Sequence, residues 1–159
     1  MKYLRYFEQI NHKPNSIDIV VDSYFETALW TSEEQDKDME NKTIYDFSES
    51  ARSRAKEEIE WFLDNAGDVF NEVSYTAIGH DLWLSRNGQG AGFFDRSGYD
   101  EDDAIFLMDL SKILGEISIE VGNDDKIYFF GGSEKYKTFD LEKYFEDLKL
   151  KKNIKKFNL

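Results

Sequence analysis

The chain has 159 residues and a mass of 18.7 kDa, which fits one folded domain and leaves little room for a second. Hydrophobic residues make up 40% and aromatic residues 16%, enough for a packed core, so global disorder is excluded. A formal net charge of -13 argues against direct binding of nucleic acid through a basic surface. The absence of cysteine excludes disulfides and thiolate chemistry.

The charge is distributed unevenly along the chain. Residues 1–140 carry 14 basic and 30 acidic side chains, whereas residues 141–159 carry six and three. We therefore expect a single acidic domain, 1–140, followed by a short C-terminal helix with a basic tail, 141–159. The first ten residues interleave charges with apolar residues, so we expect no signal peptide, no membrane contact and a cytoplasmic location.

Apolar residues recur at helical spacing in the first third of the chain. The stripe predicts a helix that begins at Ser16, which is placed to cap it, while Pro14 stays outside its interior. The stripe consists of Ile17, Val20, Val21, Tyr24, Phe25, Ala28 and Leu29. The acidic segment after Trp30 has no apolar period and predicts an exposed loop. Most of the aromatic residues, a set that includes Trp30, Trp61 and Trp83, are expected in the core rather than on an exposed stacking surface.

A second helix is predicted over residues 48–65. Asp46 and Glu49 have the spacing of a capping box, and Gly67 is placed to end the helix. Its apolar face would be formed by Ala51, Ala55, Ile59, Phe62, Leu63 and Ala66.

Two segments have the alternation of β-strands. Leu82 and Leu84 alternate with Asp81, Trp83 and Ser85, which predicts a hairpin over residues 80–86 and 91–96 that turns through 87–90. A second hairpin is predicted where the alternating run ISIEV is followed by the turn GNDD and the run KIYFF.

A third helix is predicted after the acidic residues 100–103, whose carboxylates complement a helix N-terminus, and a fourth, short helix at 141–148. The resulting order is helix, helix, hairpin, helix, hairpin, helix. This order indicates a single α+β domain in which helices pack on two antiparallel β-hairpins.

The segment GHDLWLSRNGQGAGFFDR, residues 79–96, concentrates side chains capable of chemistry. In a hairpin, His80 could act as a general base while Arg86 or Arg96 holds an anion, with Asn87 and Asp95 nearby. Cross-strand charge pairs explain the same residues without any site. The glycines lack the Lys and Ser/Thr of a phosphate-binding loop, and GNDD lacks the length of a calcium-binding loop. We therefore assign no catalytic residue, metal or cofactor.

Two runs of carboxylates form the candidate partner-binding surface. They are Glu33, Glu34, Asp36, Asp38 and Glu40 in one run, and Asp100, Glu101, Asp102 and Asp103 in the other. Duplex DNA carries on the order of 20 phosphate charges over the width of such a domain, comparable with the excess of carboxylates in residues 1–140. Gathered on one face, these carboxylates could imitate a nucleic acid.

The block at 79–96, together with DSYFETALW (22–30), YDFS (45–48) and GEISIEVGNDDKIY (115–128), resembles a family of small, mostly uncharacterised proteins. Bacteriophages, prophages and related mobile elements encode this family, whose signature is approximately GHDFWLTRNGHGAGFWDR. The resemblance covers about residues 20–130, and Leu82, Ser85, Gln89 and Phe94 replace the family's Phe, Thr, His and Trp. It implies expression in a bacterial host but no particular reaction.

From the charge and this resemblance we expect a non-enzymatic inhibitor of a host defence nuclease of the CRISPR or restriction type. Its carboxylates would act as phosphate surrogates on a basic surface. Two alternatives stay open. One is a small enzyme or ligand-binding domain with its site at 79–96, and the other is a structural or assembly factor that works as a homo-oligomer.

Overall fold

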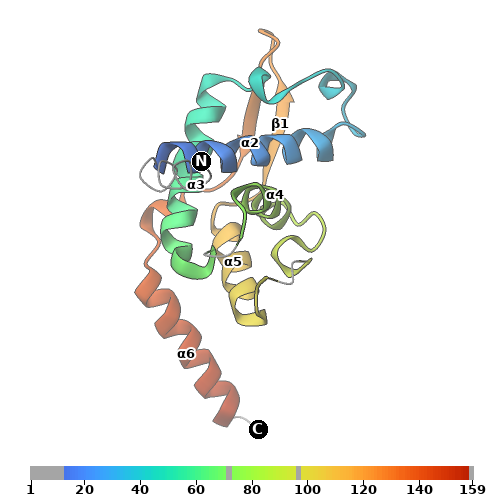
Figure 1. Cartoon of the computed structure of the whole chain (residues 1–159). Helices are drawn as coiled ribbons and strands as arrows, with labels where there is room; N and C mark the ends of the chain where they lie inside the picture. Colours follow the sequence, from blue (N-terminus) through green and yellow to red (C-terminus); the bar gives the residue numbers. More distant parts are fainter. Residues whose placement is uncertain (1–12, 71–72, 96–97, 158–159) are drawn as a thin grey trace, which may run out of the picture.

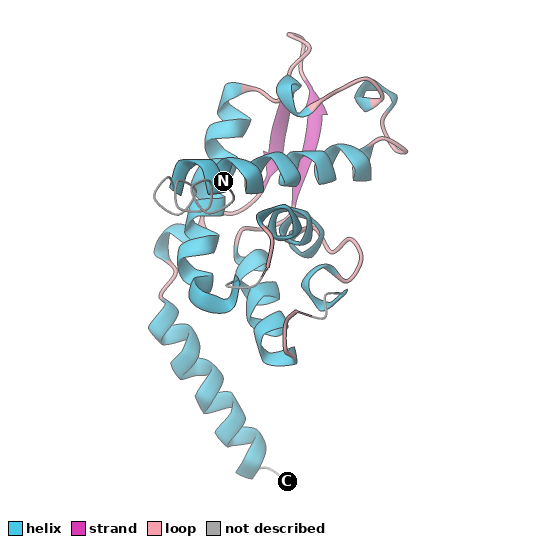
Figure 2. Ribbon diagram, viewed as in Figure 1, coloured by secondary structure: helices cyan, strands magenta, loops and turns pink. Residues whose placement is uncertain are grey.

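A computed structural model describes residues 13–70, 73–95 and 98–157 (Figure 1). Helices dominate these ranges and accompany one antiparallel hairpin, so the fold is α+β (Figure 2). The helices are α2 (Lys13–Ser32), α3 (Glu49–Ala66), α4 (Tyr75–Arg86), α5 (Glu101–Ile113) and α6 (Leu141–Phe157). The strands are β1 (Ile117–Val121) and β2 (Ile127–Gly131), and short 3-10 turns include η1 (Lys37–Met39), η2 (Ile44–Asp46) and η4 (Gly92–Asp95).

Helix α2 confirms the first predicted helix but begins earlier than expected. It starts at Lys13, so Ser16 is a buried residue inside the helix and does not cap it. Pro14 lies in the first turn, where its missing amide hydrogen costs no helical hydrogen bond.

Helix α3 follows the predicted range and ends as expected. Gly67 closes it at φ 58°, with its N–H donated to the Leu63 carbonyl. The predicted cap is wrong, because Ser48 rather than Asp46 accepts the hydrogen bond from the Ala51 amide, at 3.1 Å. Asp46 instead accepts from the Thr43 amide at 2.7 Å and closes a capping box around η2.

The first predicted hairpin is wrong, because residues 75–86 form helix α4 and residues 92–95 form the turn η4. Helix α4 lies at the centre of the molecule and is buried on nearly every side. A helix in that position needs no polar face, so its sequence lacks the helical period of a surface helix. The local alternation at 81–85 was therefore a false strand signal.

The second predicted hairpin is confirmed. Strands β1 and β2 pair antiparallel, with Ile117 opposite Gly131 and Val121 opposite Ile127. The Ser48 amide donates to the Ile127 carbonyl at 2.8 Å, which ties the hairpin to the start of α3.

Helix α5 begins after the acidic cluster, as predicted. Asp100 is its N-cap and accepts the Asp103 amide at 2.8 Å. Helix α6 was predicted to be short and followed by a tail, but it continues through the basic segment to Phe157.

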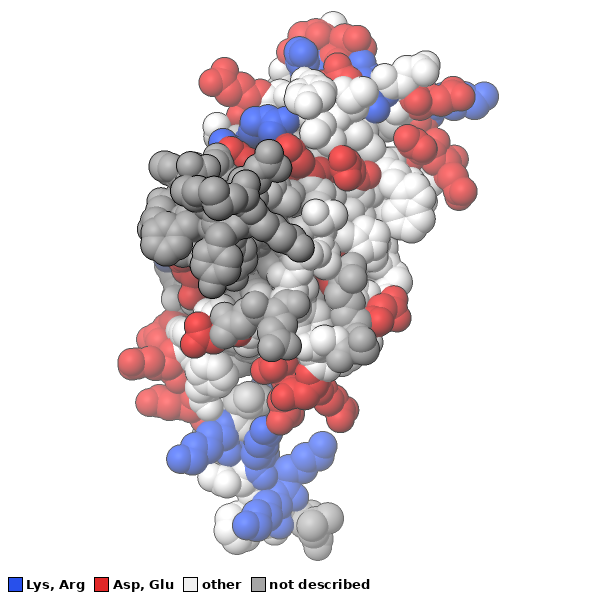
Figure 3. Space-filling view, viewed as in Figure 1, with Lys and Arg blue, Asp and Glu red and all other residues white. Residues whose placement is uncertain are grey.

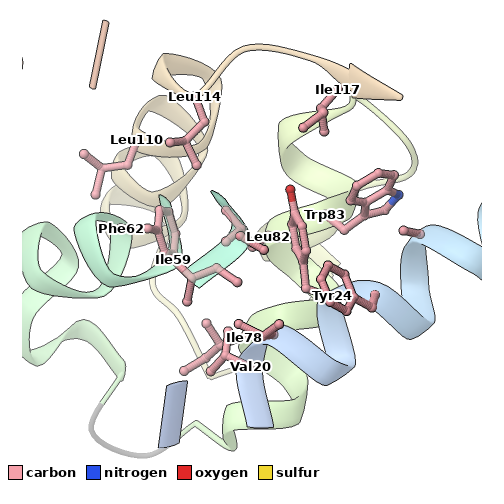
Figure 4. Packing of buried hydrophobic residues seen from close by; sticks show 14 of the residues in the cluster. Val20, Tyr24, Ile59, Phe62, Ile78, Leu82, Trp83, Leu110, Leu114 and Ile117 are labelled. Carbon is pink, nitrogen blue, oxygen red and sulfur yellow. The ribbon is translucent and has the colours of Figure 1, made fainter. Parts of the chain in front are cut away.

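The core forms where α2, α3, α4 and α5 meet (Figure 4). Helices α2 and α4 approach closely because Gly79 has no side chain at their crossing. A Cβ at that position would overlap the Val20 carbonyl oxygen and lie 2.9 Å from the Ser23 Cβ. The labelled side chains in this view are Val20, Tyr24, Ile59, Phe62, Ile78, Leu82, Trp83, Leu110, Leu114 and Ile117.

Candidate functional site

Arg86, a candidate anion-binding residue, is buried and fully paired. Its guanidinium donates to the Glu58 carboxylate and, at 2.9 Å, to the Tyr24 hydroxyl. It also donates to the carbonyls of Leu114, at 2.9 Å, and Gly115, at 2.6 Å. Arg86 and Glu58 are each only 2% exposed. These bonds leave the guanidinium no free donor direction toward solvent, so Arg86 holds helices together and does not receive an external anion.

The surroundings keep this arginine charged. Burial alone lowers the pKa of the Arg86 guanidinium, but its interactions with Tyr24 and Glu58 outweigh burial and raise that pKa above its usual value. Burial raises the pKa of the Tyr24 hydroxyl, which stays neutral. The network is thus a buried ion pair with a neutral phenol beside it.

The other predicted residues of segment 79–96 do not converge on a site. The Asn87 side-chain oxygen accepts the Ile117 amide at 2.8 Å, which fixes the start of β1. Asp95 is exposed at the end of η4, and Arg96 lies outside the described residues. Of the described residues in this set, His80 alone lines the groove that is described next, and Arg86, Asn87 and Asp95 do not.

That surface is a groove between α2 and α4 with a volume of about 510 Å³. It is lined by Ser23, Glu26, Thr27 and Trp30 from α2, and by Ser74, Thr76, Ala77 and His80 from α4 and its cap. The Ser23 hydroxyl donates to the Thr76 carbonyl, so a hydrogen bond joins the two helices that line the groove. The lining is mostly uncharged and mixes hydroxyl groups with aromatic rings.

The tautomer of His80 follows from its partner. The Thr27 hydroxyl donates its one hydrogen to the Ser23 carbonyl at 2.8 Å, and its oxygen lies 3.0 Å from His80 Nδ1. Neutral His80 must then carry its proton on Nδ1 and donate to Thr27, which leaves Nε2 as an acceptor. The partner of Nδ1 is thus a hydroxyl, whereas in a catalytic His–Asp pair it is a carboxylate.

Trp30 is an exception to the expectation that most aromatic residues are buried. It is 63% exposed, whereas Trp83 is 2% exposed, and its ring stacks near His80 with centroids 6.1 Å apart. A signal was present, because Trp30 follows Leu29 by one residue and so lies about 100° around the helix from the buried stripe. An exposed tryptophan beside a groove is typical of a binding surface.

The two carboxylate runs lie apart in the structure. The first occupies the loop after α2 and the second the start of α5, at different ends of the molecule (Figure 1). Figure 3 shows acidic side chains in separate groups around an uncharged part of the visible face. They do not form the single continuous stripe that close imitation of a duplex requires.

These carboxylates lack basic partners within the described ranges. No ion pair joins any of the nine to a described Lys, Arg or His. Burial, then repulsion from Asp100 and Asp102, raises the pKa of the Asp103 carboxyl above its usual value. The negative field of both runs is therefore directed to solvent rather than neutralised internally.

Comparison with protein-family models, with curated proteins and with solved structures finds no match for this chain. Among the described residues, no group of three or more His, Asp or Glu could hold a metal ion. No helix in those ranges is both long and apolar enough to cross a membrane.

Proposed function

We propose that the protein is a phage or mobile-element binding protein that inhibits a host nucleic-acid-processing protein, such as a CRISPR or restriction nuclease. One observation carries the proposal: the carboxylates at 33–40, which form no ion pair with a described residue, directly follow α2, on which Trp30 is exposed at a mostly uncharged groove. The bacterial setting rests on the resemblance of residues 79–96 to proteins of mobile elements. The burial of Arg86 argues against the alternative of an enzyme at that segment.

The surface has the composition of a docking site for a basic partner. Tryptophan is among the residues that contribute most binding energy at protein interfaces, and Trp30 lies one helical turn from Glu26 and three residues before Glu33. Interfaces commonly have an aromatic or apolar centre and a polar rim. Carboxylates at the rim attract a nuclease's nucleic-acid-binding surface and accelerate encounter.

The separation of the two runs favours local rather than continuous imitation of nucleic acid. Each run can replace a few phosphates, while Trp30 and the groove supply contacts that no nucleic acid offers. We therefore propose a mixed interface, in which charge guides association and the aromatic centre contributes to its lifetime.

A DNA-cleavage assay with reconstituted CRISPR and restriction nucleases tests this function. The purified protein should reduce cleavage. Added non-target DNA should compete with it if both occupy the nucleic-acid-binding surface of the nuclease. Inhibition should weaken as salt rises, because exposed charges are screened. Unimpaired cleavage by every nuclease in the panel would contradict the proposal for those enzymes.

Matched variants separate the contributions of charge and ring. Trp30→Ala should reduce inhibition at least about tenfold, the loss expected for an interface hot spot. Tyr45→Ala removes another exposed aromatic ring and serves as its control.

For charge, the triple change Glu33→Gln, Glu34→Gln and Asp36→Asn should weaken inhibition. The control removes three charges elsewhere, at the exposed residues Glu60, Glu116 and Glu120. Equal effects of the two triple variants would show that net charge alone acts, without a defined surface.

A further inference from the structure

Helix α6 is docked on the body only along its first half. The Tyr144 hydroxyl donates to Asp109 at 2.7 Å, and the rings of Tyr144 and Phe145 lie 5.7 and 5.3 Å from that of Phe106 on α5. From residue 149 to residue 157 every side chain is exposed. Figures 1 and 2 show this second half extending beyond the rest of the molecule.

The two halves of α6 present apolar residues on opposite faces. The docked stripe is Leu141, Tyr144, Phe145 and Leu148. The distal stripe is Leu150, Ile154 and Phe157, which are 59%, 51% and 82% exposed. At 3.6 residues per turn, Leu150 lies about 200° around the helix from Leu148. The distal stripe therefore points away from the surface on which the first half packs.

Lysines cover the remaining face of the distal half. They are Lys149, Lys151, Lys152, Lys155 and Lys156, and residues 148–157 include no Asp or Glu. None of the five forms an ion pair with a described residue of its own chain. The distal half is thus an unpartnered amphipathic helix whose polar face is uniformly basic.

The start of α5 offers the complementary chemistry at the same end of the molecule. Glu101 and Asp102 are exposed there, and Ile105, which is 39% exposed, lies on the same helical face at spacings of four and three. In the view of Figure 3, acidic side chains and the lysines of the projecting helix are seen at the same end of the molecule. The chain thus has, toward one end, an acidic and apolar strip and a basic and apolar helix, and no ion pair joins the two among the described residues.

We propose that residues 149–157 dock on the α5 strip of a second copy, so that two copies form a two-fold dimer. In such a dimer each copy gives one helix and receives one, and every contact occurs twice. The apolar stripe would cover Ile105 while Lys149 and Lys151, which flank the stripe, approach Glu101 and Asp102.

Charge decides between a second copy and other partners for this helix. Nucleic acid would be repelled by the excess of carboxylates in residues 1–140. Three apolar side chains on two helical turns bury little area in a lipid surface. Pairing of two distal helices with each other would bring ten lysines together. A second copy supplies carboxylates and apolar surface at once.

Light scattering coupled to size exclusion, with the full chain, tests the proposal. At about 50 mM salt the wild type should have twice the mass of the 18.7 kDa chain, and the dimer should weaken as salt rises. Leu150→Ser with Ile154→Ser should raise the dissociation constant at least about tenfold. Phe130→Ser removes a ring that is 50% exposed on β2 and should leave the dimer unchanged.

Charge exchange tests the specific pairing. Lys149→Glu with Lys151→Glu should weaken the dimer, as should Glu101→Lys with Asp102→Lys. Mixing the two variants should restore association, because one of the two symmetric contacts then has the native charges and the other has both charges reversed. As a control, circular dichroism of each variant should show the helical spectrum of the wild type.

Three results would overturn the proposal. The first is a wild-type monomer at every concentration, including one that instead sediments with phosphatidylserine vesicles. The second is a dimer that is indifferent to the Leu150 and Ile154 substitutions. The third is a dimer that depends on residues 149–157 but is not restored by charge exchange, since this would indicate pairing between the two distal helices.

Discussion

At the scale of single residues, the pairing of Arg86 with Glu58 gives Arg86 a structural role. Arg86 belongs to residues 79–96, the segment richest in side chains capable of chemistry. Arginine inside a core is costly unless every donor is satisfied, and here a carboxylate, a phenol and two carbonyls satisfy them. The same contacts join four elements, since Tyr24 is on α2, Glu58 on α3, Arg86 on α4 and Leu114 follows α5. The pair therefore orients the helices relative to one another.

Replacing only one residue of the Arg86–Glu58 pair should reduce the stability of the fold far more than replacing both. We expect Arg86→Met to lower the free energy of unfolding by about 3–5 kcal/mol, because Glu58 would remain buried without its main partner. Adding Glu58→Leu should recover part of this loss. Urea denaturation provides the measurement.

Lys56→Met is the matched control, since Lys56 pairs with Asp18 at 2.9 Å where both side chains are nearly half exposed. Its loss should cost about 1 kcal/mol or less. A double variant at 86 and 58 that is no more stable than Arg86→Met would contradict the role assigned to the pair.

Three tyrosines predict a loss of stability at alkaline pH. Burial, and then the hydrogen bond to Glu57, raises the pKa of Tyr136 from 10.0 to about 12, and burial also raises the pKa values of Tyr24 and Tyr144. A phenol with a raised pKa in the fold stabilises the fold fully below pH 10.0 and loses that contribution as pH rises toward 12. The urea midpoint should therefore fall across this window.

The variant Tyr136→Phe isolates one contribution. It should be less stable than the wild type near neutral pH, because Glu57 loses its partner, but its midpoint should fall less steeply above pH 10.0. An identical slope in both proteins would contradict the assignment to Tyr136.

At the scale of elements, the crossing of α2 and α4 depends on one glycine. Gly79→Ala should lower the free energy of unfolding by about 3 kcal/mol or more, because its Cβ would collide with backbone that cannot rotate away. Gly98→Ala is the control, since the nearest atom to its Cβ would be 3.9 Å away. Thermal unfolding followed by circular dichroism distinguishes the two, and a wild-type stability for Gly79→Ala would show that the helices can separate.

Most elements were predictable from sequence because they lie at the surface of the fold. Helices α2, α3 and α5 keep apolar stripes against the core, and β1 alternates buried and exposed residues. Helix α4 was missed because it is buried on several faces and includes the polar residues Asp81, Ser85 and Arg86 within the core. Period-based reasoning fails where polar residues satisfy one another inside the protein.

The candidate site was only partly predictable. Sequence patterns indicated the two acidic runs and His80, but not the groove, which depends on the crossing of two helices far apart in the chain. They also grouped Arg86 with His80, although the two side chains leave α4 toward different surroundings. Only a tertiary structure could separate a buried ion pair from an exposed imidazole.

At the scale of the whole molecule, the net charge of -13 predicts a protein stabilised by salt. Self-repulsion among unpaired carboxylates opposes compaction, and screening reduces it. The midpoint of thermal unfolding should rise between about 20 mM and about 500 mM sodium chloride, where the screening length falls from roughly 20 Å to a few Å. The Leu150→Ser and Ile154→Ser variant should be used, so that dimer formation does not contribute. A midpoint that falls with salt would indicate that ion pairs outweigh repulsion.

The acidic loop after α2 is anchored to the rest of the fold by a buried side chain and by an ion pair. Met39 at its middle is 0% exposed, and Lys42 bridges to Asp125 at the tip of the hairpin, 2.6 Å from the Asp125 carboxylate. Fixing a free backbone costs roughly 1–2 kcal/mol per residue. Because this entropic cost is met when the chain folds, Glu33, Glu34 and Asp36 are held at fixed positions. A partner protein can therefore bind them without having to order the loop first.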